Sequence, residues 1–147
     1  MIVSGHFNKI FSTDCDLSDP KITGGRLIVC VQGIGVIPGH PFFEKIGPSQ
    51  IRYFRSGHLI FDGVEDSLRE LTDFIGDPRD RKVTKPYVVK DGPFPKPAQA
   101  TQVFRFEGRP KPHAWVDWIV MAVSFTLEIL DARQPPWDPV LRANAPS

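Results

Sequence analysis

Asp117 interrupts the most apolar segment of the chain, HAWVDWIVMAVSFTLEIL, which covers residues 113–130. Tryptophans at positions 115 and 118 flank it. An aspartate with such neighbours is either solvated at the end of a strand or enclosed as the carboxyl group of a pocket at the rim of a sheet. Carboxyl groups in pockets often contact ligands or move protons. Both alternatives stay open at the level of sequence.

Nearby basic side chains could complete such a pocket. A buried carboxylate is costly unless it is paired or protonated, and the chain offers Arg105, Arg109 and His113 as partners. The tryptophans would supply apolar walls. We therefore predict a ligand-binding site at the sheet rim, formed by Asp117, His113, Trp115, Trp118 and Arg105.

No catalytic or metal-binding signature accompanies this site. The four histidines lie far apart in the sequence, so none forms the paired spacing of a zinc motif. Cys15 and Cys30 lack the context of a catalytic thiol, and no serine lies in a nucleophile elbow. We expect no catalytic residue, no metal ion and no cofactor.

Basic and aromatic residues alternate in two places, RYFR at 52–55 and FRF at 104–106. Such patterns can form a stacking platform for single-stranded nucleic acid. The net charge of the whole chain is only +1, however, so it creates no basic field. The pattern is explained by strands whose aromatic residues point inward and whose arginines point outward. We therefore expect no nucleic-acid partner.

The composition indicates a globular domain that can fold without disulfides. The chain has 147 residues, of which 41% are hydrophobic and 24% charged. Fifteen prolines fall mainly in connecting segments. We predict a single β-rich domain over residues 1–132 and a proline-rich tail over 133–147. Trp137 in this tail is a candidate interface residue.

The chain carries no segment that we interpret as a membrane span or a secretory signal. The run around Asp117 is too short and too polar to cross a bilayer. The N-terminal residues lack a basic region followed by an apolar one. Two cysteines are too few for a disulfide scaffold, so we expect reduced thiols and a cytoplasmic location.

Period-two patterns predict most of the secondary structure. The run 113–130 sorts its apolar residues by parity, as a long strand does, with a bend expected near 122–124. Residues 25–36 and 101–108 also read as strands. The segments 51–54 and 58–61 are predicted to form a hairpin around an Arg-Ser-Gly turn.

One helix is predicted between Val64 and Ile75. Apolar residues recur there at helical spacing, an acidic capping box precedes them, and glycine and proline follow. The alternative is a further strand over Ser67 to Leu71. The fold class is therefore mainly β, or α+β: a curved antiparallel sheet or a β-sandwich with one short helix. The predicted core comprises Leu27, Val29, Val31, Ile60, Leu68, Leu71, Phe104, Phe106, Ile119, Met121, Val123, Phe125 and Leu127.

Two segments together carry a family resemblance: GHLIFDGVEDSLREL at 57–71 and WVDWIVMAVSFTLEIL at 115–130. The pair resembles small β-rich bacterial proteins of the toxin-immunity type, which are encoded beside toxins or on mobile elements. The resemblance implies a non-catalytic protein that binds and blocks a toxin. It assigns no functional residue to a position in this chain.

Two functions are expected from these features. The first is a non-catalytic cytosolic interaction protein, of the immunity or accessory type, that binds a protein partner or a second copy of itself. The second is a small-molecule-binding protein or minor enzyme that uses the pocket near Asp117 and His113. An exposed patch would favour the first function, whereas an enclosed pocket would favour the second.

Overall fold

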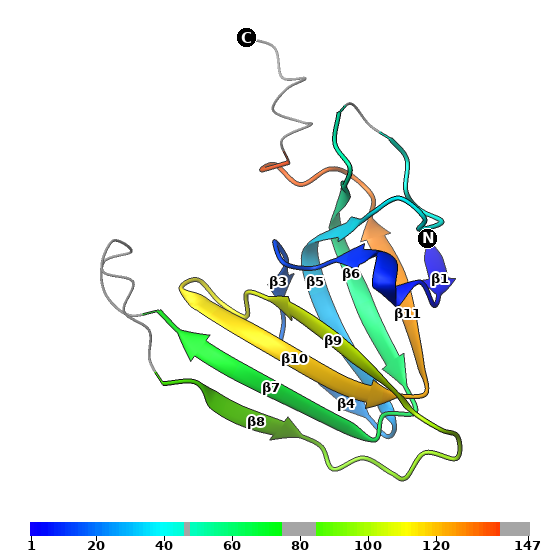
Figure 1. Ribbon diagram of the computed structural model, residues 1–147, viewed down its shortest axis with the longest axis vertical. Coiled ribbons are helices and arrows are strands. Elements are labelled where there is room, and N and C mark those ends of the chain that lie inside the picture. Colours follow the sequence, from blue (N-terminus) through cyan, green and yellow to red (C-terminus); the bar gives the residue numbers. More distant parts are fainter. Residues whose placement is uncertain (46–47, 75–84, 139–147) are drawn as a thin grey trace.

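The computed structural model describes residues 1–45, 48–74 and 85–138, which form two antiparallel sheets (Figure 1). Sheet A has seven strands in the order β1-β11-β6-β5-β2, with β3 and β4 also paired to β5. Sheet B has four strands in the order β8-β7-β10-β9. The prediction of a mainly β fold with antiparallel sheets is confirmed.

The strands of sheet A are β1 (Ile2–Ser4), β2 (Ile10–Phe11), β3 (Asp16–Leu17), β4 (Lys21–Thr23), β5 (Arg26–Val36), β6 (Arg52–Asp62) and β11 (Ser124–Asp131). Those of sheet B are β7 (Asp66–Asp73), β8 (Tyr87–Asp91), β9 (Gln102–Gly108) and β10 (Ala114–Ala122). One 3₁₀ turn, η1 (Phe7–Lys9), lies between β1 and β2.

A long two-stranded ribbon joins the sheets. Its first strand runs through β6 and β7, and its second runs through β10 and β11. At the bend, residues 63–65 of the first strand face residues 122–123 of the second, because Asp62 pairs with Ser124 and Asp66 pairs with Met121. One extra residue on one strand is the geometry of a bulge, which lets strands turn a corner between sheets.

Gly63 and Val123 form this corner. Gly63 has a φ of 63°, and a Cβ atom added to it would lie 2.5 Å from Cγ2 of Val123. The N–H of Val123 donates to the carbonyl oxygens of Asp62 and Gly63, at 3.0 and 3.2 Å. Only glycine combines this backbone conformation with so close a neighbour. The corner therefore fixes where both strands leave sheet A for sheet B.

The corner divides the run 113–130 into two strands of different sheets. The predicted bend near 122–124 is confirmed, but a single long strand is wrong. The buried side chains lie at even positions in β10, such as Val116 and Val120, and at odd positions in β11, such as Phe125 and Leu127. The odd residues of β10 therefore point away from the core, which leaves Ile119 and Met121 of the predicted core only half-buried.

The predicted helix between Val64 and Ile75 is wrong, and the alternative strand is right. Strand β7 pairs with β10 on one side and β8 on the other, and this pairing overrides the helical periodicity. Leu71 is buried, whereas Leu68 points to the opposite face and is half-buried. Ile75 lies outside the described residues.

The predicted hairpin at 51–61 is also wrong, because β6 is one continuous strand. Gly57 pairs with Val31 of β5 and with Ile129 of β11. A Cβ atom at Gly57 would lie 2.5 Å from the carbonyl oxygen of Glu128. This glycine therefore permits close approach of two backbones rather than a turn.

A polar network is buried between the sheets. The Trp118 indole donates to Ser67 Oγ at 2.9 Å, and Ser67 Oγ donates to Asp91 Oδ2 at 2.7 Å. Arg69 binds Asp91 through Nε and Nη2, at 3.1 and 2.7 Å. The Asp91 side chain is only 5% exposed and that of Arg69 13%. This bidentate pair joins β8 to β7 and orients the Trp118 ring beneath the guanidinium, 5.3 Å away.

Asp91→Ala should destabilise the protein by about 3 kcal/mol, because it leaves the largely buried Arg69 guanidinium with only the exposed Asp19 carboxylate, at 3.2 Å, as its ion-pair partner. Urea unfolding of the single variants and of Arg69→Met/Asp91→Leu would measure this. The double variant should lose less stability than Asp91→Ala. An Asp91→Ala protein with wild-type stability would contradict a structural role for the pair.

His40 is a second buried polar group, 4% exposed. Its Nδ1 accepts the Phe42 N–H at 3.0 Å, and its Nε2 has no hydrogen-bond partner among the described residues. Burial, and then the nearby His6, lower the pKa of His40 from 6.5 to about 4. The folded protein therefore holds this ring neutral at pH values where the unfolded chain would protonate it.

The free energy of unfolding should fall as the pH drops from about 6.5 to about 4. In this range the His40 ring is protonated in the unfolded chain but stays neutral in the folded protein. Below about pH 4 this contribution should stay constant. Urea unfolding at pH 7 and pH 5 would measure the loss. His40→Gln should reduce it, whereas His113→Gln, at an exposed position, should not. Equal losses in all three proteins would contradict this account.

Candidate functional site

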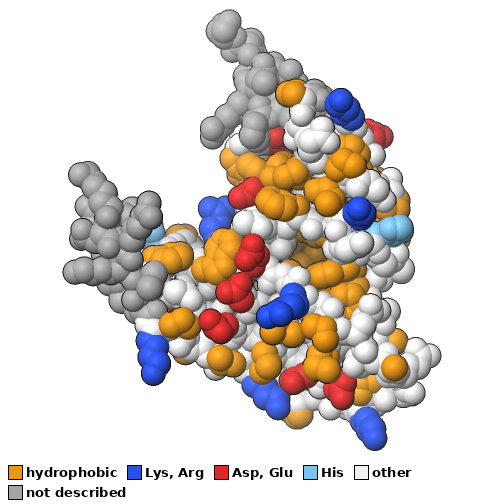
Figure 2. Space-filling model, viewed as in Figure 1, with side chains coloured by type: hydrophobic (Ala, Val, Ile, Leu, Met, Phe, Trp, Pro, Cys, Tyr) orange, Lys and Arg blue, Asp and Glu red, His pale blue; other side chains and the backbone are white. Residues whose placement is uncertain are grey.

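The face of sheet B that points away from sheet A carries apolar and charged side chains side by side (Figure 2). Its residues alternate with the buried ones along each strand. We call this surface the outer face. It comprises Asp66, Leu68, Glu70, Thr72, Val88, Lys90, Val103, Arg105, Glu107, Trp115, Asp117, Ile119 and Met121. Val88 and Val103 are 62% and 56% exposed.

Three carboxylates cross this face side by side. Asp117 in β10 is the direct cross-strand partner of both Glu70 in β7 and Glu107 in β9. We call these three residues the acidic row. Glu107 accepts a hydrogen bond from Thr13 Oγ1 at 3.0 Å. Within the described part of the chain, Glu70 and Asp117 form no ion pair and no side-chain hydrogen bond.

The acidic row works against folding. Like charges directly opposite each other on a sheet are destabilising. Asp117 and Glu70 are both exposed, so water screens part of the repulsion, and no ion pair with a described residue compensates the rest. Arg105 on the same face forms no ion pair with a described residue. A fold that keeps an unfavourable arrangement without local compensation often does so at a functional site.

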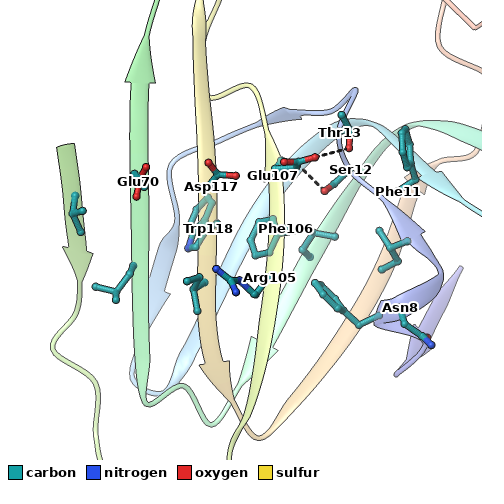
Figure 3. A pocket seen from close by; sticks show the side chains of 16 residues that line it. Asn8, Phe11, Ser12, Thr13, Glu70, Arg105, Phe106, Glu107, Asp117 and Trp118 are labelled. Carbon is teal, nitrogen blue, oxygen red and sulfur yellow. Dashed lines mark hydrogen bonds between the residues drawn. The ribbon is translucent and has the colours of Figure 1, made fainter. Parts of the chain in front are cut away.

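A groove of about 890 Å³ runs beside β9 and borders the acidic row (Figure 3). Residues 7–13 form one wall and the outer face of sheet B forms the other. Phe7, Ile10, Leu59 and Phe106 give it apolar surface. The polar residues around it are Asn8, Ser12, Thr13, Glu70, Arg105, Glu107 and Asp117.

The structure brings only part of the predicted site together. Asp117, Arg105 and Trp118 line the groove, whereas His113 and Trp115 do not. Asp117 is exposed, as the solvated alternative expects, but it lies within β10 rather than at a strand end, and it is not enclosed. The fold does bury a carboxylate paired with arginine, but the pair is Asp91 and Arg69. His113 lies in the turn before β10, where its carbonyl oxygen accepts the Phe74 N–H at 2.7 Å.

Trp137, the predicted interface residue, lies against its own chain. Its ring packs edge-on to Tyr53, with 4.7 Å between the ring centroids. Gly33 makes room for it, because a Cβ atom there would lie 2.7 Å from Trp137 Cζ2. Tyr53 donates its hydroxyl proton to Asp14 Oδ2 at 3.0 Å, and burial raises the pKa of this tyrosine. Val140 and Leu141 of the tail lie outside the described residues.

Sequence reasoning missed Glu70 and Glu107. A helix over Val64 to Ile75 does not align Glu70 with Asp117. Glu107 lies within the predicted strand 101–108, but nothing local gives the register between β9 and β10. Once three strands are assigned, an acidic residue on the same face of each is the signal that could identify the row.

The two cysteines are both free, and they differ in environment. Cys15 is fully buried, and burial raises the pKa of its thiol. Among the described residues, no three histidine, cysteine, aspartate or glutamate side chains are arranged to hold a metal ion. The same residues contain no helix of the length and apolarity needed to cross a membrane.

Comparison with protein-family models, with curated proteins and with solved structures finds no match for this chain.

Asp117→Thr should stabilise the protein by about 0.5–1 kcal/mol, because it removes two like-charged cross-strand pairs and adds a β-branched residue. Thermal unfolding at low salt would show the gain, and salt should reduce it by screening. The matched control is Asp66→Thr, which changes a carboxylate on the same face outside the acidic row. An unchanged or lower stability of Asp117→Thr would show that the row causes no strain.

Proposed function

We propose that this chain is a non-catalytic interaction protein, and that the outer face of sheet B binds a protein partner with a basic and apolar surface. The observation that supports this most is the acidic row. Three aligned carboxylates oppose folding, and only a positively charged partner would turn their repulsion into attraction.

The surroundings of the row suit a protein better than a metal or a nucleic acid. Half-buried Leu68, Ile119 and Met121 lie beside it, so a partner could cover both apolar and charged surface. Exposed apolar patches with a polar rim are typical of protein interfaces. The acidic charge of the row would repel nucleic-acid phosphates.

An immunity or accessory role in the cytoplasm remains part of the proposal. Its support is the sequence resemblance of two segments, together with the two free cysteines. A toxin with a basic surface would be the natural partner for such a protein. A gene beside this one that encodes a toxin would strengthen the proposal.

A second candidate is the binding of a small molecule in the groove. The volume of about 890 Å³ lies within the range of ligand pockets, and apolar residues with a few polar groups line it. A minor enzymatic activity would need a defined acid, base or nucleophile in contact with the ligand. The protein-binding proposal is favoured because the outer face continues beyond the groove, to Thr72 and Trp115 at one end and to Val103 and Met121 at the other.

The proposal predicts that charge reversal on the outer face abolishes partner binding. Tagged wild-type protein, Asp117→Lys and Ile119→Glu would be purified from the native host and the bound proteins identified by mass spectrometry. Both variants should lose the same partner, with affinity reduced by about a hundredfold or more. Asp117→Lys places a like charge against the basic surface of the partner, and Ile119→Glu puts a charge where the partner covers apolar surface.

Gln32→Lys provides the matched control, since Gln32 is exposed on β5 of sheet A. It should retain the partner, and circular dichroism should show all three variants folded. Retention of the partner by both Asp117→Lys and Ile119→Glu would overturn the proposal. A small molecule that binds the wild-type protein but not Phe7→Ala, together with retention of the partner by Phe7→Ala, would favour the second candidate.

A further inference from the structure

The edge of β9 that faces the groove carries free backbone hydrogen-bonding groups. Strand β9 lies at the edge of sheet B and pairs only with β10. In an antiparallel strand, alternate residues direct their N–H and C=O groups toward the neighbour and away from it. The hydrogen bonds around β9 reveal which residues point away.

Odd-numbered residues point away from β10. The Glu107 carbonyl accepts Ser12 Oγ at 2.7 Å. Arg109 donates its N–H to the Cys15 carbonyl at 2.9 Å and accepts the Leu17 N–H at 2.8 Å. By the same alternation, Val103 and Arg105 direct their N–H and C=O groups away from β10, and of these two residues Arg105 lines the groove. No described residue bonds these groups.

The pairing on the other side of β10 agrees with this assignment. Met121 and His113, both odd-numbered, accept hydrogen bonds from Glu65 N–H and Phe74 N–H at the β7 side. The even-numbered residues of β10 therefore bond to the even-numbered residues of β9, with which they are in register. The outward groups of Val103 and Arg105 follow from two independent sets of hydrogen bonds.

The chain itself covers the other end of this edge. Residues 12–17 run beside 107–109, and Asp16 forms a parallel bridge with Arg109. The free part, at 103–105, continues this row beside the groove. A strand placed there would direct alternate side chains toward Phe7 and Ile10 on one side. On the other side they would pass Arg105 and reach toward Glu107, the member of the acidic row that β9 carries.

We propose that the groove binds an extended peptide segment as an added strand on β9, with apolar residues facing the groove floor and Lys or Arg facing the acidic row. This inference rests on the proposed function and specifies how the partner binds. Backbone hydrogen bonds supply affinity in such strand addition, and alternating side chains supply specificity.

The edge strand β8, on the opposite side of sheet B, is less suited to bind an added strand than β9. Val88 and Lys90 of β8 also point their backbone groups outward, because Ser67 and Arg69 bond to their partners Asp91 and Val89. A lysine on an exposed edge is a common device against strand pairing. No described pocket lies along β8 alone, although Val88 borders the groove from the outer face.

The probe is the synthetic peptide acetyl-Lys-Ile-Lys-Val-Lys-Ile-Lys-amide, mixed with the full-length protein. Amide hydrogen exchange followed by NMR should slow at Val103 and Arg105. The same peptide with N-methyl groups on its edge-facing amides should bind at least about tenfold more weakly, because it loses backbone donors. A version with Glu in place of Lys should not bind.

Two protein variants test the edge directly. Arg105→Pro removes an outward N–H that the sheet does not use, so folding should persist while peptide binding falls about tenfold or more. Arg105→Ala keeps this N–H and should bind the peptide. Lys90→Pro makes the matching change on β8 and should leave binding unchanged.

Three results would overturn the inference: no binding of the basic peptide, equal binding of its N-methylated form, or protection at Val88 and Lys90 instead of Val103 and Arg105. The proposed function is judged separately. If Asp117→Lys and Ile119→Glu still release the native partner, the outer face binds that partner without strand addition.

Discussion

The structure depends on the contact between Gly63 and Val123. Both strands of the long ribbon pass from one sheet to the other at this point, and the two crossings touch each other. The added residue on the β6–β7 strand turns the ribbon, and the φ of 63° at Gly63 permits the turn. Val64, which is fully buried, donates its N–H to the Gly25 carbonyl and anchors the turn to the start of β5. A side chain at position 63 would separate the strands where each sheet begins.

The corner also determines which residues reach the surface. Met121 at the end of β10 and Ser124 at the start of β11 both point away from the core, and their numbers differ by three. The buried side chains therefore lie at even positions before the bend and at odd positions after it. The odd apolar residues of β10, including Ile119 and Met121, therefore face outward on sheet B although their counterparts in β11 face the core. The outer face owes its apolar character to this change of parity. A straight strand of the same composition would have buried these residues.

Much of the fold could be predicted from the sequence because strand periodicity is local. The strands at 26–36 and 102–108 and the bend near Val123 follow from such patterns. The helical spacing from Val64 to Leu71 gives a wrong prediction of a helix. The choice between helix and strand there depends on pairing with β8 and β10, which lie far away in the sequence. The same limit applies to the site. Asp117 stands out locally, but Glu70 and Glu107 become its neighbours only through register, which local composition does not encode.

The two carboxylate arrangements on sheet B serve opposite purposes. Asp91 is buried and accepts hydrogen bonds from Arg69 and Ser67, and the Trp118 indole donates to Ser67 Oγ. This network joins β8 to β7 and orients the Trp118 ring of β10.

Asp117 lies one residue before Trp118 and on the opposite face, with Glu70 and Glu107 opposite it on the neighbouring strands. The buried network ties together β7, β8 and β10, and two of these strands carry Glu70 and Asp117 on the outer face. A rigid, charged surface of this kind loses little conformational entropy when a partner binds. The stability that the interior provides is therefore what allows the outer face to retain its unfavourable charge.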